Sequence, residues 1–208
     1  MEDAYGHRIN YLRISVTDRC NERCGYCLPE EQQEWADRKE LLTDEEILRT
    51  LEAALALGLR KVRVTGGEPL LRPGIVSLLG QMRALPGLEE LAVSSNGTWL
   101  ARPIKRGEDT TFAEGLWKAG VRSLNLSLDT LDQEAYAKTT GRDLLPAFRE
   151  GLHAAKSAGF ERIRLNCVLA RGRNEHELWD LTEFAHEQGC LLRFIELMPV
   201  STREVLDE

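Results

Sequence analysis

The chain has 208 residues, 42% of them hydrophobic, and a formal net charge of −7 at pH 7, so it can bury the core of one domain. The acidic balance argues against a nucleic-acid surface, which needs a clustered basic face, although a few convergent arginines could still bind a small anion. No apolar run is long enough to span a bilayer, and the polar start MEDAYGHRINY is unlike a signal peptide. The composition therefore predicts a cytoplasmic protein that binds neither nucleic acid nor membrane.

Short β-branched or apolar runs alternate with helical stretches along the whole chain. Strands are predicted at residues 11–17, 61–65, 90–95, 123–129, 162–169 and 191–197. Helices are predicted at residues 43–57, 74–85, 112–119, 133–138, 146–158 and 175–188. Thr43 and Glu46 form a capping box at the start of the first helix. Glycines that are typical of helix ends precede four of the strands, at Gly58, Gly120, Gly159 and Gly189.

The alternation of polar and apolar residues within the strands decides between two architectures. Six β–α alternations require a parallel sheet with right-handed crossovers, either an open doubly wound sheet or a partial barrel. Strands covered by helices on both faces would be almost entirely apolar, but four of these strands have one polar face. Its residues are Arg13, Ser15, Thr17, Lys61, Arg63, Thr65, Ser123, Asn125, Ser127, Asp129, Arg162, Arg164 and Asn166. We therefore predict an α/β fold, a partial, six-stranded parallel β/α barrel whose polar face lines a ligand-filled interior.

Three cysteines follow the first predicted strand within eight residues: Cys20, Cys24 and Cys27. Active sites of such barrels lie at the carboxyl ends of the strands. Thiolates this close together are typical of iron–sulfur or zinc sites, and three ligands would leave one iron of a 4Fe–4S cluster open.

Alternative roles for the three cysteines fit less well. The spacing also matches one face of a helix, but the surrounding residues are polar. A zinc site would need a fourth ligand, for which His7 is the nearby candidate. A disulfide framework is disfavoured because five cysteines are an odd number.

With these motifs in view, the chain resembles radical S-adenosylmethionine (SAM) enzymes, and more narrowly the molybdenum-cofactor biosynthesis protein A family, the GTP 3′,8-cyclases. The stretches that carry the resemblance are YLRISVTDRCNERCGYCLPE, LLTDEEI, KVRVTGGEPLLR, SSNG, LNLSLDTLD, GRD and RFIELMPV. The resemblance implies a barrel of radical SAM type and two cofactors, a 4Fe–4S cluster on the three cysteines and SAM on its open iron. It further implies that SAM is contacted by Tyr26, Gly67, Ser127 and Met198, and that Glu68 orients its amine.

The same resemblance implies a substrate and partners. Arg13, Arg63, Ser94 and Arg164 match family positions that bind GTP, and guanidinium groups suit phosphate. The implied reaction is that of a radical SAM lyase or cyclase, the first step of molybdenum cofactor biosynthesis. Its implied partners are an electron donor and the downstream enzyme that forms cyclic pyranopterin. No oligomeric state is predicted.

One departure from the family is an absence. The family carries a second cluster in a C-terminal region, and none of its cysteines is found here, so we expect residues 1–208 to form a single radical SAM core with incomplete cyclase activity. Two alternatives stay open at this point. The chain could be a radical enzyme for another small molecule or a peptide, or a non-catalytic metal-binding remnant.

Overall fold

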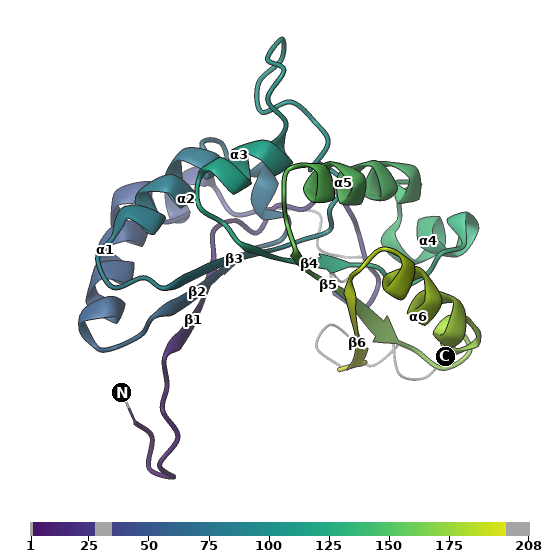
Figure 1. Ribbon diagram of the computed structural model, residues 1–208, viewed down its shortest axis with the longest axis horizontal. Coiled ribbons are helices and arrows are strands. Elements are labelled where there is room, and N and C mark those ends of the chain that lie inside the picture. The colour runs from purple at the N-terminus through teal and green to yellow at the C-terminus, as the bar shows by residue number, and fades with distance from the viewer. Residues whose placement is uncertain (1, 28–34, 199–208) are drawn as a thin grey trace.

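The computed structural model describes residues 2–27 and 35–198. Six parallel strands form one sheet whose order follows the chain, with β1 and β6 at its two edges (Figure 1). The strands are β1 (Tyr11–Ser15), β2 (Lys61–Thr65), β3 (Glu90–Ser95), β4 (Ser123–Ser127), β5 (Arg162–Leu169) and β6 (Leu191–Glu196). The prediction of a partial, six-stranded parallel barrel is confirmed, because the sheet curves without closing.

Helices connect the strands and cover the convex side of the sheet, as Figure 1 shows for α1, α2, α3 and α5. The α-helices are α1 (Asp44–Ala56), α2 (Ile75–Ala84), α3 (Phe112–Lys118), α4 (Gln133–Thr140), α5 (Leu145–Ser157) and α6 (Leu178–Glu187). Short 3₁₀ turns lie at Arg38–Glu40, Pro69–Leu71 and Glu175–Glu177. No helix in the described ranges is long and apolar enough to cross a bilayer.

Local signals in the sequence fix the helix ends. The predicted capping box is present, since the Thr43 side chain accepts a hydrogen bond from Glu46 N and the Glu46 side chain accepts one from Thr43 N. The glycines that precede four of the strands have positive φ values, for example 95° at Gly58 and 105° at Gly159, which glycine adopts without strain. The helices α1, α3, α5 and α6 therefore stop just before the next strand begins.

The register of the sheet places the polar residues on one face. Arg13 lies opposite Arg63, and Asn125 lies opposite Arg164. The alternate residues of the same strands are buried beneath the helices, including Val62, Val64, Leu124, Leu126, Ile163 and Leu165. The apolar face thus supplies the core, and the polar face lines the concave side of the sheet.

Candidate cluster and substrate site

The cysteine loop, residues 20–27, follows β1 at the carboxyl edge of the sheet. Cys27 N donates a hydrogen bond to Cys24 O at 2.9 Å, which closes a tight turn between two of the cysteines. Arg23 N donates to Thr140 O at 2.7 Å, and Gly25 N donates to Thr139 O at 3.3 Å. The loop is therefore held against the carboxyl end of α4, where unpaired helix carbonyls are available.

A buried carboxylate provides a further tether for this loop. Glu22 is 4% exposed, and the Tyr136 hydroxyl of α4 donates a hydrogen bond of 2.6 Å to its Oε1. Burial raises the pKa of Glu22 to about 7, although the bond from Tyr136 lowers it in part. The Cys24 thiol lies 3.9 Å from Glu22 Oε2, so the tether acts directly beside a cysteine.

The three thiols have the chemistry that an iron–sulfur cluster requires. Cys20 and Cys24 are half-buried, Cys27 is exposed, and a Cβ built on Gly25 would meet nothing within 4 Å. Burial raises the pKa of all three thiols, that of Cys20 to about 11, and the neighbouring thiols raise those of Cys20 and Cys24 further. Thiolates that lie this close together repel one another. A bound metal removes this repulsion because it neutralises their charges together.

These thiols are not held in a ready-made geometry. Within residues 2–27 and 35–198, no group of three or more His, Cys, Asp or Glu side chains is arranged to hold a metal ion. The donor set fits a 4Fe–4S cluster in kind and number, and binding would draw the three sulfurs together, as is usual where metal binding is coupled to local folding. His7, the nearby candidate for a fourth zinc ligand, lies 2.9 Å from Asp3 through its Nδ1.

The four residues predicted to contact SAM all follow carboxyl ends of strands. Tyr26 lies in the cysteine loop, Gly67 follows β2, Ser127 ends β4 and Met198 lies beyond β6. Ser127 and Gly67 are exposed, and Met198 is 61% exposed. The topology thus brings these residues to one rim of the sheet, and their contact with SAM stays a prediction.

Tyr26 is held in place by Asp129, which follows β4 at the same rim of the sheet. Its hydroxyl donates a 2.7 Å hydrogen bond to Asp129 Oδ2, and Val168 N donates one of 2.8 Å to Asp129 Oδ1. Asp129 is 7% exposed, and burial raises its pKa. The ring of Tyr26 is thereby fixed to both β4 and β5.

Gly66 and Gly67 have a packing role that the sequence did not reveal. A Cβ at Gly66 would lie 2.6 Å from Thr17 O, and a Cβ at Gly67 would lie 2.4 Å from Arg19 O. Gly67 N also donates to Thr17 O at 2.7 Å. The two glycines let the loop after β2 lie directly against the start of the cysteine loop.

Gly67→Ala is expected to lower the free energy of unfolding by about 2–3 kcal/mol, because the new methyl group would overlap the backbone of Arg19. Urea titration followed by circular dichroism measures this. Gly80→Ala is the control: the position lies within α2 with nothing near its Cβ, so alanine there is expected to stabilise by about 0.5–1 kcal/mol. Equal stability of Gly67→Ala and the parent would contradict the packing role.

Glu68 is a buried carboxylate that links two strand ends. It is 1% exposed, and both oxygens bind protein groups: Oε1 accepts from Leu70 N at 3.0 Å and Ser95 Oγ at 2.9 Å, and Oε2 accepts from Asn96 N at 2.7 Å. Burial raises its pKa to about 7 against the effect of these bonds. Glu68 joins the end of β2 to the end of β3, and its orientation of the SAM amine stays a prediction.

The concave face carries the predicted substrate residues. Arg13, Arg63 and Arg164 lie on this face of β1, β2 and β5, and Ser94 of β3 lies opposite Asn125. Burial lowers the pKa of Arg63, and the positive charges of Arg13, Arg193 and Arg164 lower it further. Three of the predicted residues therefore form one basic cluster.

Arg193 is a fourth member of this cluster and was not predicted. It lies on β6 opposite Asn166, on the concave face. The signal was present in the sequence, because Arg193 has the strand parity that faces away from α6. No described carboxylate forms an ion pair with any of the four arginines, so their charge is left for a ligand to balance.

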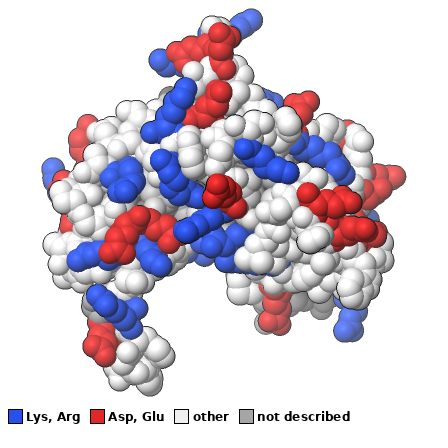
Figure 2. All heavy atoms as spheres, viewed as in Figure 1, with Lys and Arg blue, Asp and Glu red and all other residues white. Residues whose placement is uncertain are grey.

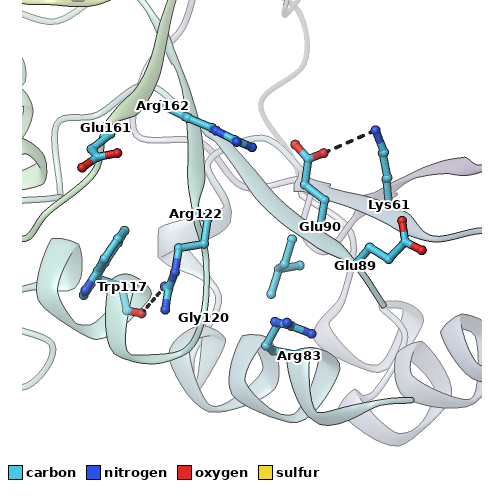
Figure 3. Close-up of a pocket in the computed structure, with 10 residues that line it drawn as sticks. Lys61, Arg83, Glu89, Glu90, Trp117, Gly120, Arg122, Glu161 and Arg162 are labelled. Atoms are coloured by element: carbon cyan, nitrogen blue, oxygen red, sulfur yellow. Dashed lines mark hydrogen bonds and ion pairs between the residues drawn. The ribbon is translucent and has the colours of Figure 1, made fainter. Parts of the chain in front are cut away.

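Figure 2 shows basic side chains near the middle of one face with acidic ones beside them. A separate cavity has a volume of about 480 Å³ and borders the amino ends of β2 to β5 (Figure 3). Some of the charged groups that line it are already paired within the protein. Lys61 and Glu90 form an ion pair of 3.7 Å, and Arg122 donates a hydrogen bond to Trp117 O. None of the four arginines of the basic cluster is among the residues that line this cavity. Its charged lining residues are Lys61, Arg83, Arg122, Arg162, Glu89, Glu90 and Glu161.

Comparisons with known proteins agree with this arrangement. A sequence model of the radical SAM superfamily matches residues 14–185. The chain is 47% identical over 198 residues to a Pseudomonas fluorescens protein named GTP 3′,8-cyclase, and the match covers 95% of this chain and 57% of that protein. A Pseudomonas aeruginosa protein named GTP 3′,8-cyclase 2 is 44% identical, with 96% and 57% covered. The chain thus spans somewhat more than half the length of these curated relatives.

Solved structures share the fold. The crystal structure of Streptococcus suis SuiB bound to S-adenosylmethionine superposes with a TM-score of 0.72 at 21% identity, over 92% of this chain and 41% of that one. E. coli HemN, described as a radical SAM enzyme, superposes with a TM-score of 0.57 at 14% identity, over 90% and 43% of the two chains. The family model extends from β1 into α6, and the chain therefore belongs to the radical SAM superfamily, whose cofactors are a 4Fe–4S cluster and SAM.

Proposed function

We propose that this chain is the radical SAM core of a GTP 3′,8-cyclase, the enzyme of the first step in molybdenum cofactor biosynthesis. The observation that carries the proposal is the basic cluster, since four arginines converge on the concave face without a described carboxylate to neutralise them. A triphosphate supplies the charge and the acceptor geometry that such a cluster requires. The similarity to named GTP 3′,8-cyclases supports GTP as the nucleotide.

Each group of residues has a part in this proposal. Cys20, Cys24 and Cys27 would hold the cluster, with Tyr26 and Gly67 beside the bound SAM. When bound, the cluster and SAM supply an electron and a carbon radical that removes hydrogen from substrate. The arginines bind and orient the nucleotide, and the curved sheet shields it from water that would compete with ring closure.

The wider biology is proposed on the same ground. The reaction needs an electron donor, and its product would pass to the enzyme that forms cyclic pyranopterin. Free thiols in the cysteine loop suit a reducing cytoplasm. The residues described here are expected to bind GTP and to take part in SAM cleavage.

Anaerobic reconstitution with iron and sulfide tests the enzyme proposal. The protein is expected to turn brown, with about four irons per chain if the cubane forms, and dithionite with SAM should then release 5′-deoxyadenosine. Stoichiometric zinc binding without nucleoside release would instead support a non-catalytic metal-binding domain. Cleavage of SAM without affinity for GTP would support a radical enzyme with another substrate.

Arg13→Ala combined with Arg63→Ala is expected to weaken GTP binding about 100-fold or more, because each change removes a charge-assisted contact to phosphate. Isothermal titration calorimetry of the reconstituted protein measures it. Arg49→Ala combined with Arg106→Ala removes the same charge from two exposed positions, one on α1 and one in the loop before α3, and should leave the affinity unchanged. If both pairs weaken binding equally, the effect is one of net charge and the site assignment fails.

A further inference from the structure

The concave face contains a layer of buried polar atoms that have no hydrogen-bond partner. They are Arg63 Nε, Asn125 Oδ1, Asn125 Nδ2, Arg164 Nε and Asn166 Oδ1. Asn125 is the extreme member, since it is 1% exposed and both ends of its amide are unpaired. Buried polar groups in proteins are nearly always bonded, and each exception calls for an explanation.

Another buried asparagine shows how this fold satisfies an amide that is purely structural. Asn174 is 5% exposed, and its Nδ2 donates to Asp129 O at 2.8 Å and to Val168 O at 2.9 Å. Its Oδ1 accepts from Ala170 N at 2.9 Å. Asn125 makes none of these contacts, although it is buried as deeply. An amide that stabilised only the fold would be bonded as Asn174 is, so a different partner is required.

The neighbours of Asn125 indicate what that partner is. Asn125 lies opposite Ser94 on one side and Arg164 on the other, both predicted substrate residues. The Arg164 side chain extends back along the sheet, and its Nη1 donates a 2.6 Å hydrogen bond to Ser123 Oγ. Ser123 precedes Asn125 by two residues on the same face of β4, so the guanidinium of Arg164 is bonded to the nearest neighbour of the amide on that face.

We propose that Asn125 is a specificity-determining residue that hydrogen-bonds the nucleoside part of the bound nucleotide. In the free protein its amide is buried and unsatisfied beside Arg164. When the anionic part of the ligand draws the Arg164 side chain away from Ser123, both ends of the amide bind the ligand. One acceptor and one donor side by side match a base or ribose edge, whereas a bare polyphosphate offers acceptors alone.

This inference rests on the proposed function. It assigns a residue to the nucleoside part of the substrate, whereas the arginines bind the phosphates. In the free protein the unpaired amide lowers the free energy of unfolding. The bound ligand restores that free energy because it supplies hydrogen-bond partners. Replacing Asn125 by the similarly sized leucine should therefore raise stability and lower nucleotide affinity together. A residue with a merely structural role would lower both.

The experiment compares parent, Asn125→Leu and the smaller Asn125→Ala with two probes, GTP and inorganic tripolyphosphate. Asn125→Leu is expected to raise the thermal unfolding midpoint of the ligand-free protein, and both variants should weaken GTP binding about tenfold while leaving tripolyphosphate affinity unchanged. Asn174→Leu is the matched control and should lower the midpoint, because it removes a fully bonded amide.

The outcomes separate the two proposals. If the parent protein does not bind GTP, the substrate proposal is overturned and this inference with it. If the parent binds GTP and both Asn125 variants bind it as tightly, only the inference is overturned. A lower midpoint or failure to fold for Asn125→Leu would show that the amide is satisfied within the free protein, for instance by water, and would also overturn it.

Discussion

Replacement of Cys20 by alanine is expected to abolish assembly of the 4Fe–4S cluster and with it all release of 5′-deoxyadenosine. Two thiols cannot hold a cubane that needs three protein ligands and one open iron. The fold should survive, because this thiol accepts only a weak hydrogen bond, from Glu22 N at 3.4 Å. Iron and sulfide content, visible absorption after anaerobic reconstitution and the unfolding midpoint measure these expectations.

Cys190→Ala serves as the control for that loss. Cys190 is half-buried just before β6, far along the chain from the cysteine loop, so the variant should bind iron as the parent does. Parent-like iron content in Cys20→Ala would contradict the ligand assignment. Loss of iron in Cys190→Ala as well would point to general unfolding rather than to a specific ligand.

Glu68→Gln is expected to destabilise the protein by roughly 2–4 kcal/mol. All three hydrogen bonds to this side chain are donated to it, by Leu70 N, Ser95 Oγ and Asn96 N. A glutamine replaces one acceptor oxygen by an amino group, so at least one buried donor would face another donor without a partner. Urea unfolding at neutral pH measures the change.

The matched control is Glu89→Gln, the same substitution at an exposed carboxylate just before β3. Its effect should lie within about 0.5 kcal/mol of zero. A Glu68→Gln variant as stable as this control would show that the link between the ends of β2 and β3 contributes little.

The sheet was predictable because its determinants are local. Strands such as residues 162–169 alternate polar and apolar side chains, and glycines such as Gly159 end the preceding helices. The three cysteines were predictable for the same reason, since their spacing is written in one short segment. The observed strands β1, β4 and β6 end one or two residues earlier than predicted, where the chain turns into the loops of the site.

The hydrogen bonds that hold the site in place were less predictable, because they join residues that lie far apart in the sequence. Glu22 looks like a surface residue in the sequence, yet it is buried through its bond with Tyr136. Glu177 is 6% exposed, and it accepts hydrogen bonds from Thr130 Oγ1 and Leu131 N in the loop after β4. Nothing near these carboxylates in the sequence indicates their partners, whereas Arg193 could have been found from its strand parity.

The strand order has a consequence for how the molecule is made. Each strand pairs with its neighbours along the chain, so the sheet can grow one βα unit at a time during synthesis. The cysteine loop cannot be finished in that way. It follows the first strand, but Asp129 lies 103 residues beyond its partner Tyr26, and Tyr136 lies 114 residues beyond Glu22. Iron loading into a completed loop is thus a late event in biogenesis, after the ribosome has delivered α4.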